Sequence, residues 1–211
     1  MASKIKIAVL ASGAGTLLQS IIDSVESGKL DAEIACVVSD VSSAKALERA
    51  RKHQIPSLFL DPAGKKREEY YSSLALELKK RGVQLVDLAG FMRIIPQSFL
   101  KEFPNAVINN HPALLPGFPG IHSVRQALEH GVKITGCTVH FVTPDLDAGP
   151  IILQKAVEVL EDDSEEILSE KIKVEERKLL PKAIALIAQG RVKIEGRKVR
   201  IDWKGFEDKW K

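Results

Sequence analysis

The first 111 residues alternate short apolar runs of strand length with longer stretches in which apolar residues recur at helical spacing. The strand-like runs are residues 4–11, 34–38, 56–60, 85–89 and 106–111. The helical stretches lie from a Thr16 N-cap to a Gly28 stop, over residues 43–54 and 66–81, and from Pro96 onward. Repeated strand–helix units predict a parallel sheet covered by helices on both faces. We therefore expect an α/β fold of Rossmann-like type, with a mostly parallel, twisted, open sheet.

The pattern changes in the second half of the chain. A helix near residues 123–129 is followed by two extended runs, 135–142 and 151–159, with no helical stretch between them. Such a pair predicts antiparallel strands. A long helix is then expected from a cap at Asp163–Ser164 to Gln189, broken or kinked near Pro181. Residues 191–201 predict a hairpin that turns at Glu195–Gly196.

Composition excludes several classes of protein. Apolar residues make up 45% and charged residues 28% of the 211, which is typical of a soluble globular protein. The net charge is +3, but eight Lys or Arg against four Asp or Glu lie from Arg191 onward, so the body is not basic. A nucleic-acid-binding domain usually has a basic body, so we expect no nucleic-acid partner and a merely solvated tail.

Cys36 and Cys137 lie in apolar, strand-like runs, so we expect both to be core residues rather than parts of a disulfide or zinc site. No apolar run has membrane-spanning length, and the first run alternates like a strand rather than a signal peptide. The expected location is the cytoplasm, without a membrane partner. A monomer or a weak homodimer is expected.

One strand ends in polar residues. The run 106–108 is apolar, and it leads into Asn109, Asn110 and His111 before Pro112, which cannot extend a central ladder. Because side chains alternate along a strand, Asn109 and His111 share one face and Asn110 points to the other. In open α/β sheets, ligands bind at this carboxyl edge. An amide beside an imidazole suits a reaction that develops negative charge on oxygen; the alternative is a capped strand end with a satisfied core histidine.

The first strand leads into the turn Ser12-Gly13-Ala14-Gly15-Thr16. Backbone N–H groups at a helix N-terminus are suited to binding phosphate. The turn lacks the third glycine of a dinucleotide fingerprint and the lysine of a P-loop, so a tight turn without a ligand is an equal alternative.

Two residues further along are candidates for the same site. Asp147 lies in a Gly- and Pro-bounded loop and gains a role only if the fold brings it to His111. His140 precedes this loop; a half-buried strand histidine is the alternative. His53, His122 and His130 are expected at the surface or at helix ends. No cluster has metal-ligand spacing, so we expect no metal.

Three segments carry a resemblance: Asn109 to Pro116, Gly136 to Phe141, and Leu146 to Pro150. Together they resemble the formyltransferases that use 10-formyltetrahydrofolate, and the likeness runs from about Ile5 to Gly190. The resemblance implies transfer of a formyl group from this co-substrate to the primary amine of glycinamide ribonucleotide, and therefore small-molecule substrates. It implies a catalytic trio of Asn109, His111 and Asp147, supported by His140.

The resemblance also implies binding residues. The ribonucleotide would be held by Gly13, Gly15, Thr16, Leu17 and Glu176. Folate would be held by Arg67, Met92, Arg93, Ile94, Ile95, Asn109, Thr143 and Asp147. Three positions depart from the family: Leu17 stands where many members have Asn, Ala113 replaces a common Ser, and Pro144 stands where an acidic residue is frequent. None of these removes a member of the trio.

We expect residues 1–202 to form one catalytic domain, with a ribonucleotide-binding half in about 1–100 and a folate-binding and catalytic half in about 101–190. Residues 203–211 would be a basic tail. In the implied reaction Asn109 and a protonated His111 stabilise the oxyanion. Asp147 would orient His111 and raise its pKa above about 6.5.

Three alternatives share part of the pattern. A methionyl-tRNA formyltransferase has the same trio but would need a further RNA-binding domain. A formyltetrahydrofolate hydrolase would need an N-terminal regulatory domain. A non-catalytic nucleotide-binding module would keep the sheet without the chemistry, and the retained trio argues against it.

Overall fold

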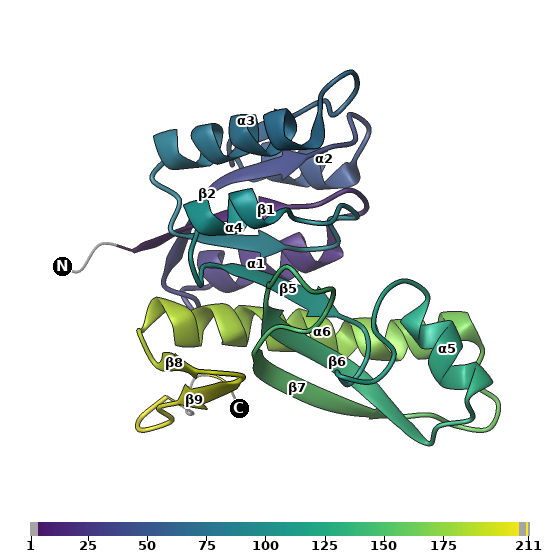
Figure 1. Cartoon of the computed structure of the whole chain (residues 1–211). Helices are drawn as coiled ribbons and strands as arrows, with labels where there is room; N and C mark the ends of the chain where they lie inside the picture. The colour runs from purple at the N-terminus through teal and green to yellow at the C-terminus, as the bar shows by residue number, and fades with distance from the viewer. Residues whose placement is uncertain (1–3, 207–209, 211) are drawn as a thin grey trace. The chain divides into compact units, whose positions relative to one another are not determined.

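The structure, a computed structural model, describes residues 4–206 and residue 210. These residues fall into two compact units that divide between Asn109 and Asn110 (Figure 1).

The first unit is a parallel α/β layer structure. Its elements are β1 (Ile5–Leu10), α1 (Thr16–Glu26), β2 (Ala32–Ser39), α2 (Lys45–Lys52), β3 (Ser57–Phe59), α3 (Arg67–Lys80), β4 (Leu85–Leu88), α4 (Gln97–Glu102) and β5 (Val107–His111), whose last two residues begin the second unit. The strand order is β3-β2-β1-β4-β5, and every neighbouring pair is parallel. This confirms the expected α/β fold and its parallel strands.

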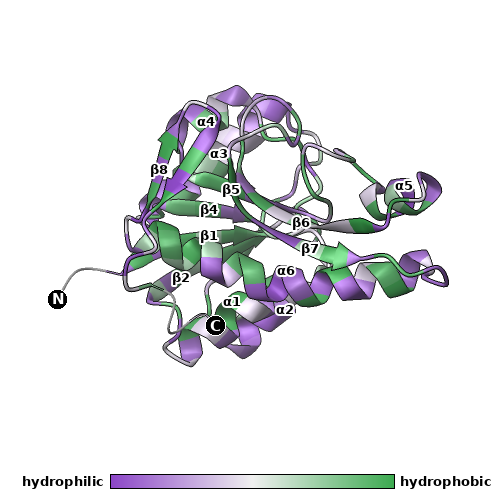
Figure 2. Ribbon diagram, turned by 90° about the horizontal axis from the view of Figure 1, so that it is seen from below, coloured by the Kyte–Doolittle hydropathy of each residue, from purple (hydrophilic) through white to green (hydrophobic). Residues whose placement is uncertain are grey.

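Helices cover both faces of these strands. α1 and α2 lie on one face, and α3 and α4 lie on the other (Figures 1 and 2). The chain changes sides because the strands are added outward from β1 first in one direction, to β3, and then in the other, from β4. The loops after β1 and β4 therefore meet at a topological switch point, where the Ser12 amide donates to the Gly90 carbonyl at 3.1 Å.

The central strands are apolar because both of their faces are covered. Ile7, Val9, Leu85 and Val86 have no exposed surface, and the green of β1 and β4 in Figure 2 follows these runs. Asp87 on β4 is the exception. It is fully buried, and neither of its carboxylate oxygens has a hydrogen-bond partner. Burial raises the pKa of Asp87 to about 8.

The second unit begins with the end of β5. It continues with α5 (Ser123–Glu129), β6 (Ile134–Phe141), β7 (Ile151–Glu158), α6 (Glu165–Ala188), β8 (Val192–Glu195) and β9 (Lys198–Ile201). β6 pairs antiparallel with β7, and β8 pairs antiparallel with β9, as the sequence predicts. α6 packs on both β6 and β7, and its buried face supplies much of the core of this unit.

The expected N-cap of α1 and the expected break in α6 were wrong. The N-cap of α1 is Gly15, not Thr16; Gly15 has a φ of 69°, and no side chain caps the helix. α6 is not broken at Pro181 but runs through it as one helix of 24 residues. A proline removes one backbone donor, and burial of the neighbouring Leu180 and Ile184 offsets that loss.

The interpretation of the C-terminal segment as a solvated tail is wrong for Phe206, although residues 203–205 are exposed. Phe206 is buried, its ring lies 6.0 Å from that of Trp203, and the Arg191 guanidinium lies 5.6 Å above it. Arg191 also donates to the carbonyls of Asp202 and Lys204. Residues 207–209 and 211 of the expected tail lie outside the described residues.

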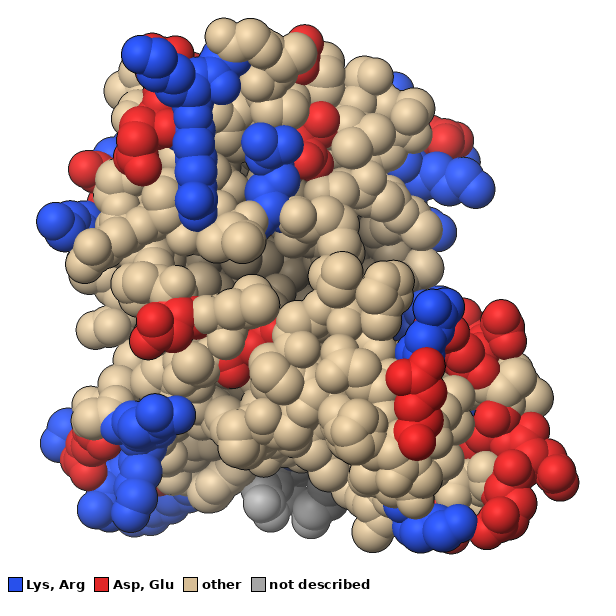
Figure 3. All heavy atoms as spheres, turned by 45° about the vertical axis from the view of Figure 1, so that its right-hand side comes forward, with Lys and Arg blue, Asp and Glu red and all other residues tan. Residues whose placement is uncertain are grey.

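Charges of both signs lie interspersed on the face of the molecule drawn in Figure 3. Cys36 and Cys137 are buried free cysteines on β2 and β6, as expected for core residues. Within the described part of the chain, no helix is both long enough and apolar enough to cross a bilayer.

Candidate active site

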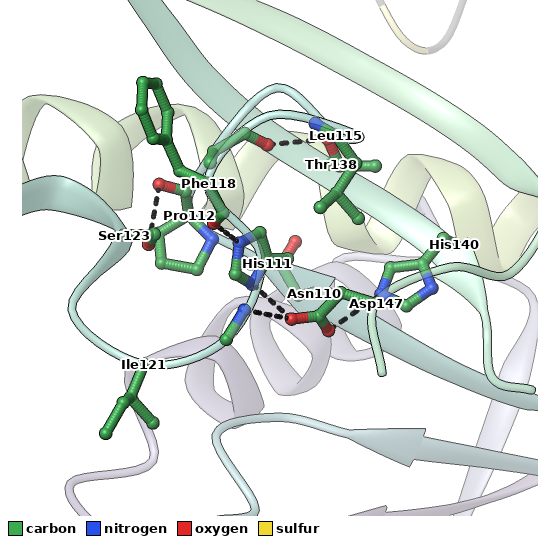
Figure 4. A network of polar contacts seen from close by, with 12 residues as sticks. Asn110, His111, Pro112, Leu115, Phe118, Ile121, Ser123, Thr138, His140 and Asp147 are labelled. Carbon is green, nitrogen blue, oxygen red and sulfur yellow. Dashed lines mark hydrogen bonds and ion pairs between the residues drawn. The ribbon is translucent and has the colours of Figure 1, made fainter. Parts of the chain in front are cut away.

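The polar end of β5 contributes the central imidazole of the site. The strand ends at His111, as Pro112 requires, and the side chains of Asn110 and His111 are buried. His111 Nε2 donates to the Phe118 carbonyl at 2.8 Å, and Nδ1 lies 3.4 Å from Asp147 Oδ2 (Figure 4). The fold thus brings Asp147 to His111, which is the condition that the sequence analysis set for a role of Asp147.

The Asp147 carboxylate has two further neighbours. Its Oδ2 accepts a hydrogen bond from the Gly120 amide at 2.7 Å, and its Oδ1 lies 3.6 Å from His140 Nε2. His140 is buried on β6, and its Nδ1 donates to the Phe141 carbonyl at 2.9 Å. His140 therefore faces the same carboxylate as His111, as Figure 4 shows. Two imidazoles and one backbone amide fix the position of this carboxylate.

The loop between β6 and β7 holds Asp147 through its backbone. Asp147 has a φ of 49°, a left-handed conformation that Asp tolerates better than most residues. Two residues later, a Cβ on Gly149 would lie 1.7 Å from the Phe141 carbonyl oxygen, so only glycine fits there. The Phe141 amide in turn donates to the Pro150 carbonyl at 2.9 Å. The L-D-x-G pattern therefore has a steric cause, because the loop folds tightly against the end of β6.

Electrostatics at this site correct one expectation. Burial lowers the pKa of His111 below 6.5, although the Phe118 carbonyl and the Asp147 charge both act to raise it. The prediction that His111 titrates above 6.5 is therefore wrong in its net direction. Burial has the opposite effect on a carboxyl group and acts to raise the pKa of Asp147. The hydrogen bonds from His140 and the Gly120 amide and the nearby His111 outweigh burial and hold that pKa below its usual value.

Backbone groups of the segment after Pro116 are functional neighbours that sequence reasoning missed. Phe118 and His122 have positive φ values of 51° and 61°, and the Phe118 carbonyl and the Gly120 amide are the groups that reach His111 and Asp147. The density of Gly and Pro in this segment indicates a turn. It does not indicate which carbonyl or amide faces the imidazole.

The opposite face of the strand end carries a second polar pair. Asn110 Nδ2 donates to Glu176 Oε1, a carboxylate that lies on α6 and is buried. Burial raises the pKa of Glu176 to about 7, and the Asn110 hydrogen bond opposes that rise. The structure thus places Glu176 next to Asn110, a residue given no role in the sequence reasoning.

The first turn of the first unit has a conformation that requires glycine at one position. A Cβ on Gly15 would lie 2.8 Å from the Ala46 Cα atom, so α2 packs directly on the turn. The Arg49 Nε donates to the Ala14 carbonyl at 2.8 Å. A Cβ on Gly13 would have no atom within 4 Å, so packing does not require glycine there. Thr16 and Leu17 form the first turn of α1, where backbone amides point outward.

The segment after β4 exposes apolar side chains. Met92 is 75% exposed and Ile94 is 62% exposed, whereas Ile95 is buried. Arg67 and Tyr71 both donate to the Ile94 carbonyl, at 3.0 and 3.1 Å. The structure therefore brings Arg67 to the segment that sequence reasoning paired with it. The expected ligand roles of these residues, of Arg93, Asn109 and Thr143, and of the first turn stay predictions.

Across the residues that the structure describes, no group of three or more His, Cys, Asp or Glu residues could hold a metal ion.

Comparison with known proteins identifies the family. Residues 5–184 match the model of the formyl transferase family. The chain is 39% identical over 197 residues to phosphoribosylglycinamide formyltransferase of Escherichia coli, which covers 93% of each protein. The crystal structure of glycinamide ribonucleotide transformylase 1 from Symbiobacterium toebii superposes with a TM-score of 0.94 at 50% identity, covering 95% of each chain. The chain belongs to the formyl transferase family.

A longer relative has the same segment within a larger protein. The chain is 42% identical over 201 residues to the human trifunctional purine biosynthetic protein adenosine-3. That match covers 95% of this chain, and the chain spans about a fifth of the length of that protein (20%).

Proposed function

We propose that the chain transfers the formyl group of 10-formyltetrahydrofolate to the primary amine of glycinamide ribonucleotide, in purine synthesis. The names of relatives that it matches over nearly their whole length support this substrate pair. The observation that carries the proposal is the contact between His111 and Asp147, because it places a titratable imidazole beside a fixed carboxylate at a strand end.

The reaction needs stabilisation of one charge and transfer of one proton. The amine attacks the formyl carbon, a C–N bond forms, and negative charge develops on the formyl oxygen. Asn109 and His111, which alternate onto one face of β5, would donate hydrogen bonds to that oxygen. The amine proton then passes to the folate nitrogen as its bond to the formyl carbon breaks, with Asp147 assisting the transfer through a water.

The lowered pKa of His111 defines its part in this reaction. In the free enzyme at neutral pH the imidazole is mainly uncharged, with its proton on Nε2 toward the Phe118 carbonyl. A developing oxyanion is a stronger acceptor than a carbonyl, so it would replace Phe118 as the partner of Nε2. Asp147 beside Nδ1 favours uptake of a second proton from solvent, so that an imidazolium faces the negative charge; the ring returns this proton to solvent after the formyl group has been transferred.

The residues that we propose for substrate binding divide between the two units. In the first, Gly13, Gly15, Thr16 and Leu17 would bind the ribonucleotide phosphate through backbone amides. Arg67 and the exposed side chains of the segment Met92–Ile95 would bind folate. In the second, Thr143 and Asp147 would contact folate, and Glu176 would bind the ribose.

The wider organisation belongs to the same proposal. Residues 1–202 would act as one catalytic domain in the cytoplasm, as a monomer or weak homodimer. Small-molecule substrates would be the partners, rather than nucleic acid or membrane, and the chemistry would need no metal. Light scattering after gel filtration measures the oligomeric state, and activity after dialysis against a chelator tests for a metal requirement.

The decisive assay mixes the purified protein with 10-formyltetrahydrofolate and glycinamide ribonucleotide and follows folate absorbance. Formation of tetrahydrofolate only when the ribonucleotide is present supports the proposal. Formation without the ribonucleotide would instead indicate a hydrolase. Binding of either ligand without turnover would indicate a non-catalytic module. In a second assay, charged initiator tRNA replaces the ribonucleotide, and transfer of the formyl group to it would indicate a tRNA formyltransferase.

A further inference from the structure

Ser12 lies in the turn assigned to the ribonucleotide phosphate, but its side chain serves another segment. The Ser12 hydroxyl donates to Asp40 Oδ1 at 2.7 Å and accepts a hydrogen bond from the Met92 amide at 3.0 Å. The Ser12 amide donates to the Gly90 carbonyl at 3.1 Å. Ser12 thus connects the end of β1 to both sides of Phe91, at the start of the exposed segment Met92–Ile95.

Asp40 follows the end of β2, and its side chain is 8% exposed. A carboxylate only accepts hydrogen bonds, so it fixes the direction of the Ser12 hydroxyl and leaves an oxygen lone pair facing the Met92 amide. The other carboxylate oxygen lies 3.8 Å from Arg93 Nη1. Asp40 therefore acts on two consecutive residues, on Met92 through Ser12 and on Arg93 by charge.

The exposed segment depends on polar contacts for its position. Phe91 and Ile95 are buried and anchor its two ends, but Met92 and Ile94 between them are largely exposed, so burial of those two side chains contributes little to the order of the backbone that they occupy. At its far end the Ile94 carbonyl is held by Arg67 and Tyr71. At its near end the contacts include the Ser12 hydroxyl, the Asp40 carboxylate and the ring of Tyr70, which lies 5.3 Å from the Arg93 guanidinium.

We propose that Ser12 and Asp40 are positioning residues for folate, although Ser12 lies in the turn assigned to the ribonucleotide. They hold the near end of the segment Met92–Ile95 in the conformation that binds the folate co-substrate. This inference rests on the proposed function. It predicts that loss of the Ser12 hydroxyl weakens binding of folate more than binding of the ribonucleotide, although Ser12 lies in the turn assigned to the ribonucleotide.

The experiment compares the variants Ser12→Ala, Asp40→Ala and the double variant with wild type. Ser12→Ala should raise the KM for 10-formyltetrahydrofolate about five- to tenfold, the scale of one lost hydrogen bond. The ribonucleotide KM and kcat should each stay within about twofold. Because the two residues form one chain of contacts, the double variant should be no worse than the more damaged single variant.

Ser24→Ala is the matched control, since its hydroxyl in α1 bonds only to the Ser20 carbonyl among the described contacts. It should change neither KM. If Asp40→Ala does not fold, judged by its melting temperature, Asp40→Asn replaces it; this variant keeps an acceptor for Ser12 and loses only the charge beside Arg93, so a smaller rise in the folate KM is expected.

Calorimetric titration with tetrahydrofolate separates failure of this inference from failure of the proposed function. Wild type that binds no tetrahydrofolate would overturn the proposed function. Wild type that binds it, with Ser12→Ala binding it equally well, would overturn the positioning role alone. An equal loss of affinity for folate and ribonucleotide in Ser12→Ala would also overturn that role, because it would show general damage to the switch point.

Discussion

His111 Nδ1 lies 3.4 Å from Asp147 Oδ2, although the two residues are 36 positions apart in the chain. The distance is longer than that of a strong hydrogen bond, and the carboxylate accepts a hydrogen bond from the Gly120 amide at 2.7 Å. The pair is thus held in place by backbone before any substrate binds. Apo catalytic contacts are often long and tighten in the substrate complex, so this geometry fits a resting site.

The first prediction concerns the turn after β1. Gly15→Val should raise the ribonucleotide KM by tenfold or more, because a Cβ there meets Ala46 at 2.8 Å and φ is positive. The folate KM should change far less. Gly28→Val is the matched control, since Gly28 also has a positive φ and no atom lies within 4 Å of the position that its Cβ would take. Steady-state kinetics with each substrate varied in turn gives both constants, and equal damage to both in a folded Gly15→Val protein would contradict the phosphate assignment.

A second prediction concerns Asp87 and pH. Its pKa of about 8 in the folded protein exceeds the ordinary value of 3.8, so the folded state keeps a proton that the unfolded state releases. Stability from this group is therefore greatest below about pH 4 and is lost as pH rises toward 8. The loss is about 1.4 kcal/mol per pH unit within that window.

Asp87→Asn removes the titration with little change in shape. Urea unfolding of both proteins from pH 5 to 9 should show the wild-type free energy of unfolding falling relative to the variant up to about pH 8 and parallel to it above. Parallel curves over the whole range would mean that Asp87 is ionised in the folded protein.

A third prediction concerns the C-terminal segment. Deleting residues 205–211 should leave kcat within about twofold, because every assigned site residue precedes Gly190. It should nevertheless lower Tm by several degrees, because Phe206 is buried against Arg191 and Trp203. Phe206→Ala in the full chain should reproduce most of that loss. An unchanged Tm in both would show that Phe206 adds nothing to stability, and a tenfold loss of kcat in a folded truncation would place part of the site in this segment.

Much of the fold could be predicted because local signals agree with the tertiary arrangement. Pro56 marks β3 as a short edge strand, and the absence of a helical stretch between β6 and β7 indicates their antiparallel pairing. Pro112 fixes the end of β5 at His111. The meeting of His111 and Asp147 follows from no local signal; the family resemblance implied it.

Other features depend on tertiary burial, which the sequence does not encode locally. The net pKa of His111 reflects desolvation, which depends on every element packed around the ring. Glu176 and Asn110 are 66 positions apart, so their hydrogen bond could not be read from spacing. Gly15 replaces Thr16 as the N-cap of α1 because α2 packs so closely on the turn that a side chain does not fit. The burial of Phe206 could not be predicted, because the residues that pack on it, Arg191 and Trp203, are not spaced from it at a helical or strand period.

The central claim, that Asp147 acts through His111, is tested most directly by an NMR titration of the His111 imidazole in wild type and Asp147→Asn, read beside kcat. In wild type the pKa should lie below 6.5, because burial outweighs the carboxylate. In Asp147→Asn it should fall further, because a charge that raises it is gone. Loss of acid–base assistance should lower kcat by about a hundredfold or more, with the ribonucleotide KM little changed. Asp162→Asn, an exposed carboxylate of the same unit, is the control and should change none of these values. An Asp147→Asn protein with wild-type kcat, or a slow one with an unchanged His111 pKa, would contradict the claim.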